Sequence, residues 1–440
     1  MSAAAPDYSD LYGSTELSDI SMVLAEHAEH LNLHVDTDGG WSNGKLKISI
    51  PVPAGQLAEG ELLVRGMYAA RPDVSACSQE QLLQLLLLAD SYGVPKVLAA
   101  ETAAFASIAP ADIQWETINA LYELPPGCAE LDACKPLFAA AGEKLQQELG
   151  DLELVWADED KQQLLLDLPQ PALLQLLQDG RTRVASENTV FYTVESWWWS
   201  RVDSSDTQPS PSVQALAELV RMQHCTPLYV ATTLADSELA QQCFTPQELA
   251  VACTLATAAH SNQTQLVQAL ADKSPVLAKY PAWSAEQRPA SAMRQLQLQL
   301  RLPLQTLKEV FECSQEDSSA YRVVYGMLHI WQGARFQLQM QLDGTDNKPG
   351  LEVAGFVSLY APAAAVCQAT CSFELRKPRD RPQCMRPFTA TFSNGDSWGE
   401  ASMLQLHQAS WAATKAHLRA QDLVHSNGCL HLHAAVMGME

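Results

Sequence analysis

The stretch of residues 168–199, LPQPALLQLLQDGRTRVASENTVFYTVESWWW, constrains the fold of this chain more than any other. It predicts two helices with a sharp break between them, because Pro169 favours a helix start and Gly180 a helix end. Ser186 is a suitable N-cap for the second helix, and Glu187 in its first turn suits the helix dipole. Apolar side chains then recur on one helical face: Val190, Val194, Trp197 and Trp198. The stretch therefore predicts a buried helix pair with no residues suited to catalysis.

The composition of the 440-residue chain indicates about two to four globular domains. Hydrophobic residues make up 47% and charged residues 18%, which is typical of packed cores rather than disorder. The longest apolar run, residues 82–89, is far too short to cross a bilayer, so we expect no membrane association. The N-terminus, MSAAAPDYSDLYG, lacks the basic and apolar runs of a signal peptide. Eleven cysteines without C-x-x-C spacing fit a reducing compartment, which predicts a cytoplasmic or nuclear protein.

The charge of the chain is strongly acidic. There are 51 Asp and Glu residues against 28 Lys and Arg residues, giving a net charge of −23. A nucleic-acid-binding surface needs clustered basic residues, and none stands out along the sequence. We therefore expect no nucleic acid among the partners, and we attribute the charge mainly to solubility.

Three successive regions predict a multidomain α+β protein. Residues 14–123 mix short strands with helices, and a capping box of Ser78 and Gln81 begins an apolar helix there. Residues 124–290 are helical, and Thr245 followed by proline gives another strong helix start.

The last region, residues 291–440, predicts an antiparallel β-sandwich. Leucines alternate with polar residues over residues 296–304, and apolar residues alternate in the same way over residues 336–342. A short helix is expected at residues 304–311. Further strands, separated by turn clusters, are expected at residues 353–360, 370–375 and 430–433.

The order of motifs resembles a BTB domain followed by a BACK domain. The helix pair at residues 168–199 is similar to BACK, in which a leucine pair, Val-x-Ser-Glu and an aromatic helix follow one another. LSDI at residues 17–20 is similar to the opening strand of BTB, and residues 61–68 and 82–92 are similar to two of its helices. Such proteins are adaptors of cullin-3 ubiquitin ligases. The resemblance implies that Tyr92 contacts the cullin, although a packed aromatic side chain at a helix end explains this residue equally well.

The N-terminal region departs from the BTB pattern after its first hairpin. The family carries a histidine followed by a further helix, whereas here His34 is followed directly by VDTDGGW. About one helix is missing, and in the family this helix lies near the dimer interface and the cullin surface. Homodimerisation and cullin binding through residues 14–123 are therefore left open.

The C-terminal region, residues 291–440, resembles a MATH (TRAF-like) sandwich in the order of its short motifs. FVSLY at residues 356–360 is similar to one strand of that fold, and Trp398-Gly399 is similar to its WG turn. The resemblance implies that this region holds a protein substrate.

No residue set predicts a metal, a cofactor or catalysis. His27, His30 and His34 have helical spacing, but no cysteine or carboxylate completes a metal site. His431 and His433 share one strand face, where a structural role is favoured. Phosphate-binding loops and nucleophile-elbow motifs are absent, so we predict no cofactor and no enzymatic activity.

The leading hypothesis is a substrate-recognition adaptor of a cullin-3 ubiquitin ligase. The BTB-like region would bind the cullin, the BACK-like helices would act as a spacer, and the β-region would hold an unknown protein substrate. Tethering acts by raising the effective concentration of the substrate near the charged ubiquitin carrier. The alternative is a scaffold or self-assembly protein that uses the same folds without a ligase.

Overall fold

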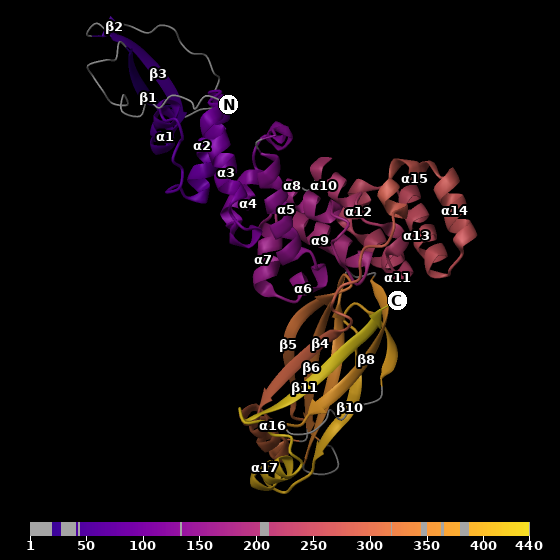
Figure 1. Cartoon of the computed structure of the whole chain (residues 1–440). Helices are drawn as coiled ribbons and strands as arrows, with labels where there is room; N and C mark the ends of the chain where they lie inside the picture. Colours follow the sequence, from indigo (N-terminus) through magenta and orange to yellow (C-terminus); the bar gives the residue numbers. More distant parts are fainter. Residues whose placement is uncertain are drawn as a thin grey trace. The chain divides into compact units, whose positions relative to one another are not determined.

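The computed structural model is a mixed α and β protein with a helical middle and antiparallel sheets toward the C-terminus (Figure 1). The described residues are 20–27, 41–42, 45–132, 134–202, 211–317, 319–344, 350–361, 365–378 and 387–439. The chain divides into two compact units, Met1–Gln147 and Glu148–Glu440. Within the described ranges, every helix is too short or too polar to cross a lipid bilayer. The finer division at residues 123 and 290 stays a prediction.

The first unit contains a small mixed sheet and several helices. Strand β1 (Ile20–His27) pairs in parallel with β3 (Lys45–Pro53), and β3 pairs antiparallel with β2 (Trp41–Ser42). The predicted opening strand, residues 17–24, is thus described from Ile20 onward. The helices of this unit are α1 (Leu57–Tyr68), α2 (Gln79–Ser91), α3 (Pro95–Ala106), α4 (Trp115–Tyr122) and α5 (Lys135–Leu149), which ends just inside the second unit.

Helix α2 begins as the sequence predicts. Ser78 Oγ accepts a hydrogen bond from the Gln81 backbone N–H at 3.2 Å, and the Ser78 N–H donates to Gln81 Oε1 at 3.1 Å. Gly93 follows the helix with a φ of +62°, a conformation that glycine adopts without strain. The buried face of α2 packs with α1 and α3 in one apolar cluster: Leu63, Leu85, Leu88, Ala89, Val94 and Val97.

The second unit begins with a series of short helices. The predicted helix pair is confirmed as α8 (Gln170–Gln178) and α9 (Glu187–Trp199), and Ser186 Oγ accepts from the Asn188 N–H at 3.3 Å. Helix α9 is buried on almost every side. The other helices of this region are α6 (Leu152–Trp156), α7 (Glu159–Asp167), α10 (Pro211–Ala217), α11 (Pro227–Tyr229), α12 (Glu238–Cys243), α13 (Pro246–His260), α14 (Thr264–Lys273) and α15 (Pro275–Lys279). Of these, α6, α7 and α10 pack directly against α9, whereas α14 packs against α13 and α15.

Two antiparallel sheets complete the second unit, with strand orders β10-β7-β6-β5 and β4-β11-β8-β9. Their inner faces share one apolar core, as expected for two sheets packed face to face. The predicted alternation is confirmed, since β4 alternates strictly between buried and exposed residues. The strands are β4 (Leu296–Pro303), β5 (Tyr321–Trp331), β6 (Ala334–Gly344), β7 (Leu351–Tyr360), β8 (Val366–Arg376), β9 (Phe388–Ser393), β10 (Ser397–Leu406) and β11 (Cys429–Met439).

Two helices belong to this sandwich. Helix α16 (Leu304–Glu316) follows β4 directly and runs further than the predicted 304–311, and α17 (Trp411–Ala420) precedes β11. Both lie at the end of the sandwich away from the helical region (Figure 1). The opposite end, where β5 turns into β6 and where β11 finishes, faces the helices.

Candidate binding site at the junction of the helices and the sandwich

The linker between the helical region and the sandwich, residues 285–293, is fixed to the helical region by hydrogen bonds. Asp151 accepts from Ser291 Oγ at 2.6 Å and from the Ala292 N–H at 2.8 Å. The Val184 N–H donates to the Pro289 carbonyl at 3.1 Å, and the Ser291 N–H donates back to Val184 at 3.0 Å. Asp151 is buried, so these bonds replace the water that its carboxylate would otherwise need.

A buried ion pair holds the same linker. Arg288 Nε lies 3.0 Å from Glu187 Oε1, and each side chain is 1% exposed. The Arg221 N–H also donates to Glu187 Oε2 at 3.2 Å. Burial raises the pKa of Glu187, and the Arg288 guanidinium opposes that rise. Glu187, predicted as a dipole-stabilising acid of α9, is thus also the partner of a linker arginine.

The β5–β6 hairpin inserts its turn against the start of α9. Gln332 and Gly333 have φ values of +51° and +75°, as a tight two-residue hairpin turn requires. A Cβ atom on residue 333 would lie 2.7 Å from the Asn188 carbonyl oxygen, so only glycine fits without a shift. In the same turn, the Gln332 backbone N–H donates a hydrogen bond to Glu153 Oε2 at 3.3 Å.

Glu153, on α6, is the buried acceptor at the centre of this contact. Thr189 Oγ1 donates to Glu153 Oε1 at 2.6 Å, and the Ala185 N–H donates to the same oxygen at 3.1 Å. Burial raises the pKa of Glu153 to about 7, although the three donors lower it. One carboxyl group therefore connects α6, α9 and the hairpin of the sandwich.

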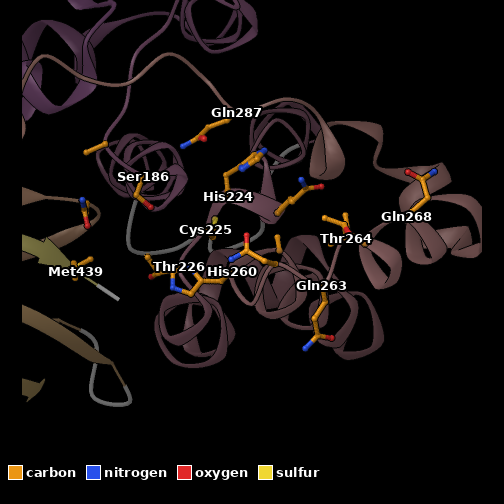
Figure 2. A pocket seen from close by; sticks show the side chains of 16 residues that line it. Ser186, His224, Cys225, Thr226, His260, Gln263, Thr264, Gln268, Gln287 and Met439 are labelled. Atoms are coloured by element: carbon orange, nitrogen blue, oxygen red, sulfur yellow. The ribbon is translucent and has the colours of Figure 1, made fainter.

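An open pocket of about 580 Å³ lies beside this contact, and we call it the junction pocket. Met439, the last residue of β11, lies on the sandwich side of it, and Gln268 on α14 lies on the far helical side (Figure 2). Most other lining groups are amides and hydroxyls. They include Ser186, Gln223, Thr226, Asn262, Gln263 and Gln287.

The two histidines and the cysteine of the junction pocket do not form a nucleophilic site. Cys225 is buried, and burial raises the pKa of its thiol well above the usual value, so the reactive thiolate is disfavoured. His224 Nε2 lies 3.0 Å from the Ala285 carbonyl oxygen and is therefore engaged in a hydrogen bond. Burial lowers the pKa of the His224 ring. His260 lines the same pocket. The pocket is therefore suited to hydrogen bonding with a polar ligand such as a peptide backbone.

A smaller pocket of about 320 Å³ lies on another side of the hairpin. Arg335 Nε donates to the Tyr192 hydroxyl at 2.9 Å, and Tyr360 and Asn394 complete the sandwich side. On the helical side, Glu195 accepts from Ser237 Oγ at 2.5 Å, and burial raises the pKa of Glu195. This pocket thus presents one exposed cation among aromatic and polar groups.

No protein-family model matches this chain, and no curated protein matches it. The similarity to BTB, BACK and MATH domains therefore stays a prediction from the motifs, and so do the roles that it implies.

Tyr92, the predicted cullin contact, ends helix α2 in the first unit. Its ring is half-buried against the apolar cluster of that unit, and its hydroxyl donates to the Pro51 carbonyl on β3. Burial raises its pKa. The residue therefore has a structural role at the helix end, while its contact with a cullin stays a prediction.

The histidines singled out in the sequence lie in different places. His27 ends strand β1, so helical spacing does not apply to it, and His30 and His34 lie outside the described residues. His431 and His433 lie two residues apart on β11, as expected. Among the described residues, no three His, Cys, Asp or Glu side chains gather in a geometry that could hold a metal ion.

Sequence reasoning missed the residues that build the junction. Asp151, Glu153 and Arg288 lie in unremarkable local sequence, and their partners are up to 179 positions away. One signal was available, because Gly333 comes shortly before the alternating segment 336–342 and glycine favours a turn there. It predicts the turn but not the surface against which the turn packs.

Proposed function

We propose that this protein is a non-catalytic substrate adaptor of a cullin-3 ubiquitin ligase, in which residues 148–440 hold the substrate. The observation that carries the proposal is the junction itself, where hydrogen bonds and a buried ion pair fix the linker and the β5–β6 hairpin to the helices. An adaptor works by holding its substrate at a defined place, and a rigid mounting serves that purpose.

The junction pocket is the proposed substrate site. Its amide and hydroxyl lining matches the hydrogen-bonding groups of a peptide main chain, and its Met439 wall offers an apolar contact. The raised pKa of Cys225 and the engaged ring of His224 support a binding role over nucleophilic catalysis. The acidic net charge of −23 favours basic segments of the substrate.

The cullin-binding part of the proposal rests on the BTB-like motifs around Tyr92. A pull-down of the full chain with the cullin-3 N-terminal region tests it, and the wild type is compared with a form that carries an added BTB-type helix after His34. Binding by the wild type supports the proposal directly. Binding only by the extended form assigns the loss to the missing helix. Absence of binding by both forms overturns the ligase role.

The alternative function, a self-assembling scaffold, is favoured by one observation. Strand β5 is an edge strand of its sheet, and it exposes a row of large apolar side chains: Tyr321, Tyr325, Met327 and Leu328. Exposed edge strands pair readily with strands of other chains. Light scattering of the wild type and of Tyr325→Lys tests this alternative, which predicts a higher oligomer that the substitution breaks.

A further inference from the structure

Five basic side chains gather on the outer face of the sheet β4-β11-β8-β9, away from the shared core. They come from β4, β8, β11 and the turn before β11: Arg301, Arg376, His425, His431 and His433. We call them the basic cluster. The basic cluster does not correspond to a run of basic residues in the sequence. Its members come from separate strands, and the pairing of these strands in the sheet brings them together.

The strand register aligns the cluster in a row. His431 on β11 is paired with Arg301 on β4 and with Arg376 on β8, so the three side chains stand side by side. In the next row, His433 is paired with Gln299 on one side and with Glu374 on the other. Two arginines therefore flank one histidine across three neighbouring strands.

The ring of His431 is held firmly in this row. The His425 ring stacks on it with centroids 3.7 Å apart and planes within 6°. Asn427 Nδ2 lies 3.1 Å from its Nε2 atom, and Gln299 Nε2 lies 3.5 Å from its Nδ1 atom. His431 itself is 9% exposed, whereas Arg301 and Arg376 are exposed. The cluster thus combines a fixed imidazole with two exposed guanidinium groups.

The positive charge of the row lacks a balancing acid within the described part of the chain. Neither Arg301 nor Arg376 lies within ion-pair distance of a described carboxylate, although acids outnumber bases by 51 to 28 in the whole chain. Glu374 is the carboxyl group nearest in register, and its buried Oε1 has no hydrogen-bond partner. Arg301 and Arg376 are therefore two exposed cations on one sheet face, one on each side of His431, and both are free to pair with a bound anion.

We propose that the basic cluster binds a dianionic tetrahedral oxyanion, a phosphate or sulfate group. Guanidinium groups match the geometry of such oxyanions and bind them through paired hydrogen bonds. Two arginines already balance a dianion, and an imidazole that takes up a proton adds a further positive charge beside it. A metal ion is the poorer fit, because two arginines would repel it and no described three-ligand set is present. The cluster is distinct from the junction pocket, since His431 precedes Met439 by eight residues, roughly 26 Å along the strand.

Proton uptake should accompany anion binding. Burial and the positive charges of His425, Arg301, His433 and Arg376 lower the pKa of His431 to about 4, so the ring is neutral near pH 7. The pKa of His433 is also lowered, by burial and by Arg376, His425 and Arg301. A bound dianion reverses the sign of the local field, and one proton passes from solvent to the imidazole. Affinity for a fixed-charge anion therefore rises as pH falls.

Titration calorimetry of the full chain with sodium sulfate tests the proposal, because sulfate stays a dianion from pH 8 to pH 5.5. Perchlorate at equal ionic strength provides the reference. If binding brings the pKa of His431 back to its ordinary value, the sulfate affinity should rise about tenfold over this range. Arg301→Gln with Arg376→Gln should abolish binding. His431→Gln should bind with a weaker pH dependence than the wild type, and the remaining dependence comes from His433.

Arg322→Gln is the matched control, since Arg322 is an exposed strand arginine of the other sheet that pairs with Glu309 at 3.3 Å. It should bind sulfate as the wild type does. Equal loss in this control, undiminished binding by the double variant, or an affinity independent of pH would each overturn the proposal. Inorganic phosphate and O-phosphoserine, titrated at pH 7.5, distinguish a free anion from an ester group by which of them binds more tightly.

Discussion

The two units of the chain bury carboxyl groups in opposite ways. In Met1–Gln147, Glu101 on α3 is fully buried and neither of its carboxylate oxygens has a hydrogen-bond partner. In Glu148–Glu440, the buried Glu153 accepts from three donors, and Glu187 is paired with Arg288. The first unit tolerates its acid by keeping it protonated, whereas the second uses its acids to join separate segments of chain.

The pKa values express the same difference. Burial alone raises the pKa of Glu101 to about 8. Glu153 is equally inaccessible to solvent, yet its donors limit the rise of its pKa to about 7. A buried acid without hydrogen-bond partners lowers the free energy of unfolding increasingly as pH rises. A buried acid with partners instead links the segments that donate to it.

The largest expected effect comes from breaking the buried ion pair. Arg288→Ala leaves Glu187 buried without its cation, which should lower the free energy of unfolding of the second unit by about 3–5 kcal/mol. Urea denaturation at pH 7 measures this loss of stability, and hydrogen exchange of the α9 amides shows whether the loss is centred on that helix. The control Arg181→Ala alters an exposed side chain, 59% accessible, and should change stability far less. Equal effects of the two substitutions would contradict a central role for the pair.

The second effect is the pH dependence of the first unit. The pKa of Glu101 is raised from an ordinary 4.5 to about 8, so its contribution to stability is complete below pH 4.5 and is lost as pH rises through 8. Glu101→Gln should remove this loss, which amounts to roughly 2–4 kcal/mol. Hydrogen exchange of α3 between pH 5 and pH 8.5, corrected for the intrinsic rates, measures the difference. Parallel pH profiles of wild type and variant would show that another group is responsible.

The third effect separates packing from backbone strain at the hairpin. Gly333→Ala adds a Cβ atom 2.7 Å from the Asn188 carbonyl oxygen at a φ of +75°, and should cost about 2–3 kcal/mol. Gly395→Ala has a similar φ of +81° but open space around it, so it should cost only about 1 kcal/mol. Thermal denaturation of both variants gives the difference. If Gly395→Ala proved as costly as Gly333→Ala, the close contact with α9 would contribute nothing.

The smallest effect concerns Tyr92. Tyr92→Phe removes the hydrogen bond to the Pro51 carbonyl while keeping the packed ring, so the first unit should lose about 1 kcal/mol. Chemical denaturation measures the stability, and the cullin-3 pull-down measures binding of the same variant. Loss of binding at nearly unchanged stability would favour the contact role over the structural one.

Local sequence predicts much of the secondary structure of this protein. The helix pair α8 and α9, the capping box at Ser78, the helix start at Thr245, and the alternation of β4 all appear where the sequence places them. Each depends on residues within a few positions of one another, so the printed order of residues contains the whole signal. The candidate site is different, because its members come from helices, a linker and a hairpin that are far apart in sequence.

The sequence by itself thus determined the helix pair α8 and α9, the capped start of α2 and the alternating faces of β4 and β6, but not β5, β9, β10 or α17. Only the tertiary structure decided that Glu187 meets Arg288, that Glu153 receives the Gln332 turn, and that Arg301 and Arg376 flank His431. The physical reason is that propensity, capping and periodicity are local, whereas ion pairs and strand register join residues that share no local pattern.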